Sequence, residues 1–122
     1  MSDLQEKAEL EVVDRGPDWL FVRLHPGEQQ DHLADELWAL LSQHFIYRIV
    51  LEMDEVKFFP SLLMGQLVML QKRVLQHDGA LRLCGLSPQC KDALHLCRLD
   101  HALPNFECRT DAVYGNMHTK PR

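Results

Sequence analysis

Two short apolar runs near the start of the chain predict a β-hairpin. The runs extend from Glu9 to Asp14 and from Trp19 to Leu24, and both are rich in Val, Leu or aromatic residues. The four residues between them, Arg15-Gly-Pro-Asp18, are of the types that favour a tight turn. We therefore expect the chain to open with two antiparallel strands.

The next two segments predict a helix followed by a buried strand. Between Gln29 and His44 the apolar residues recur at helical spacing with polar residues between them, which is typical of an amphipathic helix packed on a flat surface. From Phe45 to Met53 the chain is almost continuously apolar. This second pattern indicates a strand covered on both faces, so we expect a central strand that runs parallel to a neighbour.

Two pairs of serine and proline mark the starts of further helices. Pro60-Ser61 precedes a helical pattern that runs to about Gln76, and Ser87-Pro88 precedes one that reaches about Cys97. A serine at a helix start can accept a hydrogen bond from an early helical amide, and proline is compatible with the first turn. We expect both serines to cap their helices.

The remaining strands complete an α/β pattern. Ala80 to Leu86 predicts a buried strand, and Phe106 to Arg109 predicts a short last one. The alternation of strands and helices after residue 29 is that of right-handed βαβ units. The expected fold is an α/β sandwich in which helices pack mainly on one side of a mixed sheet of about four or five strands. No repeat or linker divides the chain, so residues 1–114 are expected to form one domain and 115–122 a mobile tail.

Composition and charge narrow the classes of function. The 122 residues are 46% hydrophobic and 25% charged, which suits a globular domain that needs neither a disulfide nor a metal to hold its core. A formal net charge of −5 argues against a nucleic-acid-binding surface. No run is long and apolar enough to span a bilayer, and the N-terminus lacks the core of a signal peptide. We expect a cytoplasmic protein without membrane insertion.

The cysteines do not predict a metal site. They form no Cys-x-x-Cys pair and no zinc-finger spacing, so we expect reduced thiols, with Cys84, Cys90 and Cys97 acting as small buried hydrophobic residues. The cluster of His95, Cys97 and His101 has no fourth ligand at a suitable spacing. Neither a metal nor a cofactor is predicted.

Three segments together carry a family resemblance. Val56 to Gly65 stands in the place of a Val-x-Phe-Ile-Asp-Ser-Ser-Gly-Leu-Gly motif, and Gly79 to Pro88 resembles Gly-x-Leu-x-Leu-x-Gly-Leu-Ser-Pro. Leu94 to Pro104 is similar to Leu-x-x-x-Gly-Leu-x-x-x-Phe-Pro. These are motifs of the STAS family, named for sulfate transporters and anti-sigma factor antagonists. The resemblance covers roughly Ile46 to Phe106 and implies a STAS-like sandwich and a non-catalytic, protein-binding function.

The first motif is divergent at its switch position. Only Ser61 and Gly65 keep the identity of the family residues, whereas Pro60 replaces the acidic residue, Leu62 the second serine and Leu63 the first glycine. In the anti-sigma factor antagonist branch a partner kinase phosphorylates the first serine, so the resemblance implies Ser61 as the phosphorylation site. Without the acidic neighbour, we expect the purified protein to be mostly unphosphorylated.

The helix that follows Pro60 offers a surface for a protein partner. A helical wheel places Leu63, Leu67, Leu70 and Val74 on the core side, and Met64, Val68 and Leu75 on a flank against a neighbouring helix. The other positions face outward, next to a glycine where a partner backbone can approach. The predicted partner-binding residues are Ser61, Leu62, Gly65, Gln66, Met69 and Arg73.

The preferred function is that of an anti-sigma factor antagonist. The resemblance implies docking of a protein partner, such as an anti-sigma factor or a histidine-kinase-like ATPase, on this helix. A phosphate on Ser61 would release an apolar partner, because its charge would be desolvated without a matching cation. The alternative within the family is an unswitched scaffold subunit of a larger complex, which Pro60 and Leu63 favour. The sequence leaves homo-oligomerisation open.

A small enzyme is the alternative from another class of protein. His25, Asp31, His32 and Asp35 cluster around the first helix, and His32 with Glu36 is an i, i+4 pair that can bind a metal or relay protons. Solvated helix residues account for the same pattern. The chain has no Gly-rich phosphate loop, nucleophile elbow or paired-carboxylate signature. No catalytic residue is therefore assigned.

Overall fold

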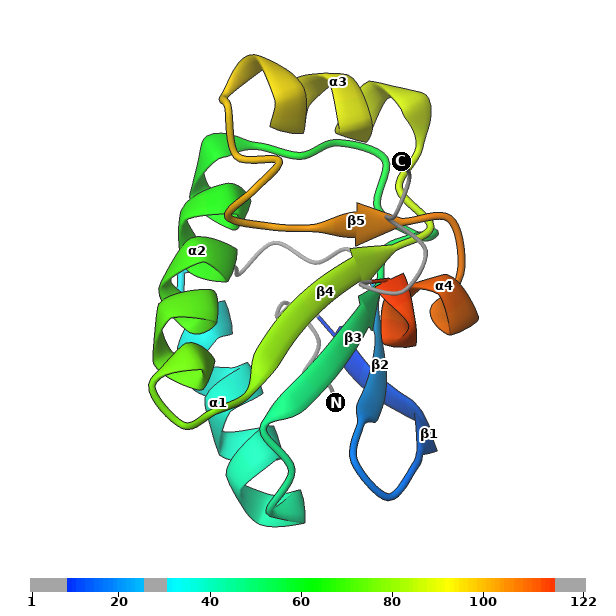
Figure 1. Ribbon diagram of the computed structural model, residues 1–122. Coiled ribbons are helices and arrows are strands. Elements are labelled where there is room, and N and C mark those ends of the chain that lie inside the picture. The colour runs from blue at the N-terminus through cyan, green and yellow to red at the C-terminus, as the bar shows by residue number, and fades with distance from the viewer. Residues whose placement is uncertain (1–8, 26–30, 116–122) are drawn as a thin grey trace, which may run out of the picture.

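A five-stranded mixed sheet forms the centre of the protein, seen in a computed structural model that describes residues 9–25 and 31–115 (Figure 1). The strands stand in the sequential order β1-β2-β3-β4-β5. In chain order the elements are β1 (Glu9–Arg15), β2 (Leu20–His25), α1 (Leu33–His44), β3 (Arg48–Glu52), α2 (Ser61–Leu75), β4 (Ala80–Cys84), α3 (Pro88–Leu96), β5 (Asn105–Phe106) and α4 (Arg109–Val113).

The topology confirms the predicted hairpin and the predicted central strand. β1 and β2 are antiparallel, whereas β3 runs parallel to both β2 and β4. Helices α1 and α2 lie on one side of the sheet and the short α4 on the other, with α3 at the top in this view (Figure 1). The α/β class and the placement of helices mainly on one side are therefore confirmed.

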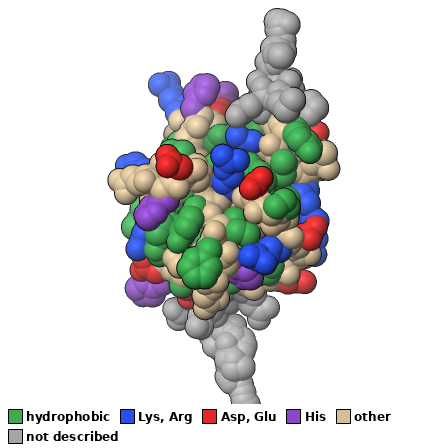
Figure 2. Space-filling view, turned by 60° about the horizontal axis from the view of Figure 1, so that its bottom comes forward, with side chains coloured by type: hydrophobic (Ala, Val, Ile, Leu, Met, Phe, Trp, Pro, Cys, Tyr) green, Lys and Arg blue, Asp and Glu red, His purple; other side chains and the backbone are tan. Residues whose placement is uncertain are grey.

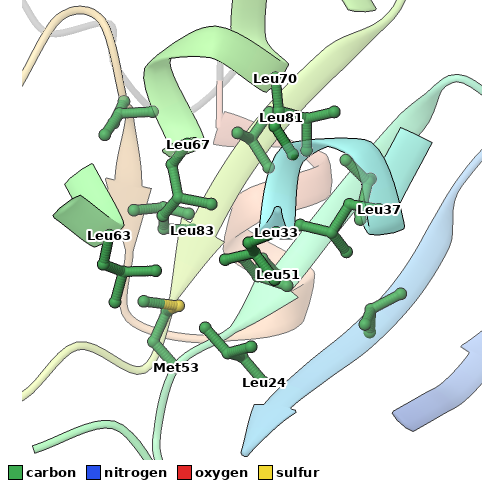
Figure 3. Close-up of a cluster of buried hydrophobic side chains, with 14 of the residues drawn as sticks. Leu24, Leu33, Leu37, Leu51, Met53, Leu63, Leu67, Leu70, Leu81 and Leu83 are labelled. Atoms are coloured by element: carbon green, nitrogen blue, oxygen red, sulfur yellow. The ribbon is translucent and has the colours of Figure 1, made fainter. Parts of the chain in front are cut away.

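The main core lies between the sheet and the two long helices (Figure 3). Alternate residues of the three central strands point into it, and one stripe from each helix meets them. The fully buried members include Leu24, Leu33, Leu37, Leu51, Met53, Leu63, Leu67, Leu70, Leu81 and Leu83. The core face predicted for the second helix is thus confirmed. A smaller cluster around Trp19, Phe21 and Val50 lies on the opposite face of the sheet, so β3 is covered on both faces.

Two element starts differ from the sequence prediction. α1 begins at Leu33 rather than Gln29, while residues 26–30 lie outside the described part of the chain. The buried strand begins at Arg48, because Phe45 still belongs to the end of α1. Phe45 caps that helix in the left-handed conformation, with φ 55°, and its ring is 84% exposed. The apolar run had included it in the strand because composition alone does not show where a helix ends.

The C-terminal region contains a helix that the sequence pattern did not predict. β5 is only two residues long, and Arg109, expected at the end of a strand, instead begins α4. Five residues are too few to show a helical period, so tertiary contacts define this element. Gly115 is buried, and a Cβ there would lie 2.2 Å from the Phe106 ring. Residues 116–122, the rest of the predicted tail, lie outside the described residues.

A buried glutamine of α2 completes the outer edge of β4. β5 pairs with β4 only at Leu83 and Cys84, so the first half of that edge has no strand neighbour. There the Gln71 side-chain amide donates to the Leu81 carbonyl at 2.9 Å and accepts from the Leu81 N–H at 3.0 Å. It also donates to the Ala102 carbonyl at 2.8 Å. One side chain therefore joins α2, β4 and the segment before β5.

Replacing Gln71 with leucine should destabilise the fold. The change keeps a similar volume but leaves the Leu81 N–H and two carbonyls without partners, which should cost about 2–4 kcal/mol of unfolding free energy. Urea denaturation measures this, with Gln43→Leu as the control, since Gln43 is an exposed glutamine of α1. The control should stay within about 0.5 kcal/mol of the parent protein. A loss below about 1 kcal/mol for Gln71→Leu would show that water replaces these bonds.

Candidate functional site

The loop between β3 and α2 fixes the place where α2 begins. Val56 and Phe59 are buried in the main core, whereas the ring of Phe58 between them is 77% exposed. The Cys90 thiol of α3 lies 3.6 Å from the Val56 carbonyl oxygen, which ties this loop to a second helix. The loop is thus held on both sides of Phe58, and this aromatic ring is exposed to solvent shortly before α2 begins.

Ser61 is the first residue of α2 and does not cap it. Pro60 is the N-cap, with φ −70° and ψ 161°, and no side chain makes a capping hydrogen bond at this end. The predicted cap at Ser61 is therefore wrong, although Ser87 does cap α3 by accepting from the Cys90 N–H at 3.1 Å. Proline takes the N-cap position because its fixed φ suits the extended conformation required there. The Ser61 residue is exposed, and the first turn contains no acidic residue.

The outer face of α2 carries exposed apolar side chains around an open glycine. Leu62 is 49% exposed and Met69 is 57% exposed. Between them, Gly65 is exposed, and apart from the adjacent backbone of α2 itself no heavy atom lies within 4 Å of the position that a Cβ would take. An approaching backbone would meet no obstruction at this point. The three residues define what we call the α2 face, together with Ser61 at its start.

The other two predicted partner-binding residues turn toward α1, which the helical wheel did not predict. The Gln66 side-chain oxygen accepts from the Ala34 N–H at 2.8 Å, in the first turn of α1. The Arg73 guanidinium lies 3.4 Å from the Asp35 carboxylate and 4.4 Å from the centre of the Trp38 ring. Both residues hold α1 and α2 together beside the α2 face.

The predicted flank of α2 packs only in part. Met64 is buried and Val68 is half-buried, but Leu75 is exposed and lines a groove of about 330 Å³ at the edge of β4. The expectation that Leu75 packs on a neighbouring helix is wrong. β5 is too short to reach this part of the sheet, so nothing among the described residues covers the leucine.

The cysteines differ in burial from the prediction at one position. Cys84 and Cys90 are buried as expected, but Cys97 is exposed because α3 ends at Leu96. Burial, and then the negative charge of Glu52, raises the pKa of the Cys84 thiol to about 12. This thiol therefore stays protonated at neutral pH. Within residues 9–25 and 31–115, no group of three His, Cys, Asp or Glu side chains has the geometry of a metal site.

The polar residues weighed for an enzyme have structural partners or are exposed just before α1. His25 lies 2.7 Å from Glu11 across the hairpin, and Asp35 pairs with Arg73. Asp31 and His32 are exposed. Figure 2 shows one end of the molecule, where histidine side chains lie among hydrophobic and charged ones. These contacts account for the polar cluster as ordinary surface structure.

A buried ion-pair network on the second face of the sheet had no signal in the sequence. The Glu52 side chain is only 7% exposed and pairs with Arg23 at 3.2 Å and Arg109 at 2.6 Å. Arg109 also reaches Asp14 at 3.2 Å, and its hydrogen bond to Glu52 raises the pKa of its guanidinium. The network joins three strands to α4. Glu52 stands within a run of apolar residues, and only the fold shows which arginines reach it.

The family model of the STAS domain matches residues 8–112. The chain belongs to the STAS domain family. The match includes the N-terminal half, which lies outside the segments that carried the motif resemblance. Among the described residues, no helix combines the length and the apolar character needed to cross a membrane.

Solved structures of STAS proteins share this fold. A Thermotoga maritima protein solved by NMR has a TM-score of 0.76 with 12% identity over 98% of each chain. An anti-sigma factor antagonist domain protein from Planctomyces limnophilus gives 0.69 with 21% identity, covering 87% of this chain and 96% of its own. The anti-sigma factor antagonist SpoIIAA in its unphosphorylated form gives 0.63 with 15% identity, covering 94% and 99%. No curated protein sequence matches the chain.

Alanine at Gly65 should stabilise the protein. The site is an exposed helix interior with free space for a Cβ, so the change should add about 0.5–1 kcal/mol to the unfolding free energy by restricting the unfolded chain. Gly79→Ala is the matched control, because a Cβ there would lie 1.9 Å from the Tyr47 carbonyl oxygen and should destabilise the fold. Chemical denaturation of both variants measures the difference. Destabilisation by Gly65→Ala would mean that the α2 face is not open.

Proposed function

We propose that this STAS domain is a non-catalytic protein-interaction module that resembles an anti-sigma factor antagonist. Its partner is a protein regulator, such as an anti-sigma factor or a histidine-kinase-like ATPase. This partner docks on the start and the outer face of α2. The domain acts in the cytoplasm. By binding that regulator it influences transcription, as part of bacterial partner-switching signalling.

The α2 face is the observation that carries this proposal. Leu62 and Met69 expose apolar surface on either side of Gly65, and the exposed ring of Phe58 adds to it where the helix begins. Adjacent exposed apolar side chains favour a protein contact, and Met and aromatic residues are enriched in such contacts. Family membership adds support, because three of the structural neighbours are described as anti-sigma factor antagonists or as putative ones.

The helix presents this face as a rigid surface. Its inner side is fully buried through Leu63, Leu67 and Leu70, and Gln71 binds it to the edge of the sheet. Gln66 holds its outer half to α1. A surface that is already ordered loses little conformational entropy when a partner docks, so a modest apolar area supports useful affinity.

A phosphate on Ser61 would act on binding rather than on folding. The hydroxyl stands at the positive end of α2, whose amides and dipole favour an anion. The neighbouring Leu62 would lie in the apolar contact, where about two negative charges would be desolvated. Phosphorylation would therefore weaken docking while the domain stays folded.

An unswitched scaffold is the second candidate, and two departures from the family motif favour it. Pro60, in the place of the acidic residue, serves as the N-cap of α2, and Leu63, in the place of a glycine, is fully buried in the core. Both replacements have structural roles here. A domain of this kind would keep the α2 face and bind its partner without regulation at Ser61.

Aspartate at Met69 should abolish partner capture without unfolding the domain. Met69 is largely exposed, so a charge there costs little stability but would be desolvated in an apolar contact. Affinity capture from native lysate, with captured proteins identified by mass spectrometry, measures the loss. Leu96→Asp is the control, since it makes the same kind of change at an exposed apolar residue of α3.

An anti-sigma factor or a kinase-like ATPase should be captured by the parent protein and by Leu96→Asp, but not by Met69→Asp. If Met69→Asp captures it equally well, the α2 face is not the docking surface.

The role of Ser61 is tested by a pair of substitutions. Ser61→Ala should bind the captured partner normally and change the unfolding free energy by less than about 0.5 kcal/mol, because the hydroxyl caps nothing. Ser61→Asp should bind more weakly while its thermal unfolding is unchanged or slightly raised by the helix dipole. Calorimetric titration and thermal melts measure both. Undiminished binding by Ser61→Asp would favour the scaffold over the switch.

A further inference from the structure

The second face of the sheet is covered only in part by α4. That helix contacts β3, β4 and β5, and it encloses a small apolar cluster with Trp19, Phe21, Val50 and Cys84. Ala80, the first residue of β4, packs at the edge of this cluster, opposite Arg48 at the start of β3. Two arginines, Arg48 and Arg82, alternate there with residues that face the main core, so their side chains lie on the second face.

Both arginines lie against the same indole ring. The guanidinium carbon of Arg48 is 5.9 Å from the centre of the Trp19 ring, and that of Arg82 is 5.2 Å from it. The two strands are direct neighbours, with Arg48 opposite Ala80 and Arg82 opposite Val50. Two positive groups on neighbouring strands therefore lie within 5.9 Å of the centre of one indole ring.

Neither arginine forms an ion pair with a carboxylate among the described residues. The buried Glu52 is occupied by Arg23 and Arg109. Arg48 lines a cavity of about 300 Å³ together with Asp18 and Asp78. Neither aspartate forms an ion pair with Arg48. An arginine does not lose its proton at neutral pH, so the repulsion between the two groups persists.

Arg82 is the more constrained of the two arginines. One of its terminal nitrogens donates to the Ala112 carbonyl at 2.7 Å and lies 3.3 Å from the Val113 carbonyl, at the end of α4. Burial, and then the charge of Arg48, lowers the pKa of Arg82. Its remaining N–H groups and those of Arg48 have no acceptor among the described residues. Both arginines thus keep donors for a ligand.

We propose that Arg48 and Arg82 together bind a tetrahedral phosphate dianion beside Trp19. Planar guanidinium groups match the oxygen spacing of phosphate, and a dianion neutralises two cations at once. A monovalent carboxylate would leave one positive charge unbalanced. The ligand is inorganic phosphate or the phosphoryl group of a monoester. This site lies on the side of the sheet opposite α2, so it is independent of the proposed docking function.

Titration of the protein with phosphate tests the site directly. At constant ionic strength, and above the second pKa of phosphate, the side-chain Nε–Hε resonances of Arg48 and Arg82 should shift together and saturate, with inorganic phosphate in one arm and methyl phosphate in the other. Saturation by only one arm identifies the source of the ligand. Acetate should give no saturating shift. Arg98, an exposed arginine after α3, is the internal control and should not respond.

Arg48→Gln distinguishes a ligand site from simple packing, because the two explanations predict changes of opposite sign in the melting temperature. In phosphate-free buffer the variant should melt at a higher temperature than the parent, since the repulsion with Arg82 is removed. Phosphate should stabilise the parent more than the variant, and its affinity for the variant should fall about tenfold or more. The Arg98→Gln variant should behave like the parent.

Two results would overturn the proposal. A lower melting temperature for Arg48→Gln without phosphate would show that Arg48 only packs on Trp19. Shifts that do not saturate, or that Arg98 shares, would show an unspecific ionic effect.

Discussion

The position of α2 depends on the amide of Gln71. The backbone N–H and carbonyl groups at a buried strand edge need hydrogen-bond partners. β5 is too short to supply these partners for the first half of β4. The side chain of one helical residue supplies the donor and the acceptor that a neighbouring strand would have offered at Leu81. This requirement fixes the rotation of α2 about its axis. Because the buried stripe and the exposed stripe lie on opposite sides of one helix, the same bonds also decide which residues reach solvent.

The two faces of the sheet are held by different forces. Aliphatic side chains pack between the sheet and the two long helices, whereas the opposite face combines a few aromatic rings with arginines and acids. The cost of burying Glu52 is offset by two guanidinium groups that also anchor α4. Among the described residues, one side of the sheet is therefore packed by aliphatic side chains, and the other carries charged side chains beside a smaller apolar cluster.

The elements that were predictable from the sequence are those with a local signal. The hairpin, the central strand, the core stripe of α2 and the cap at Ser87 each depend on residues within a few positions of one another. The features that were missed depend on distant partners. Gln66 and Gln71 are ordinary polar residues until the fold brings Ala34 and Leu81 beside them, and α4 is too short for a period of its own. In the candidate site, the open position at Gly65 and the exposed side chain of Met69 were predictable from the sequence. The contacts of Gln66 and Arg73 with α1 were not.

The contacts of α4 have a consequence for the order of folding. Arg109 joins Glu52 across 57 positions of the sequence and Asp14 across 95. Contacts between residues so far apart form late, because closing a long loop costs entropy before any contact is gained. The parallel strands and α2 can assemble without them. We therefore expect α4 to dock last on the folding pathway and to open first in the native state, so that its amides exchange with solvent faster than those of β3.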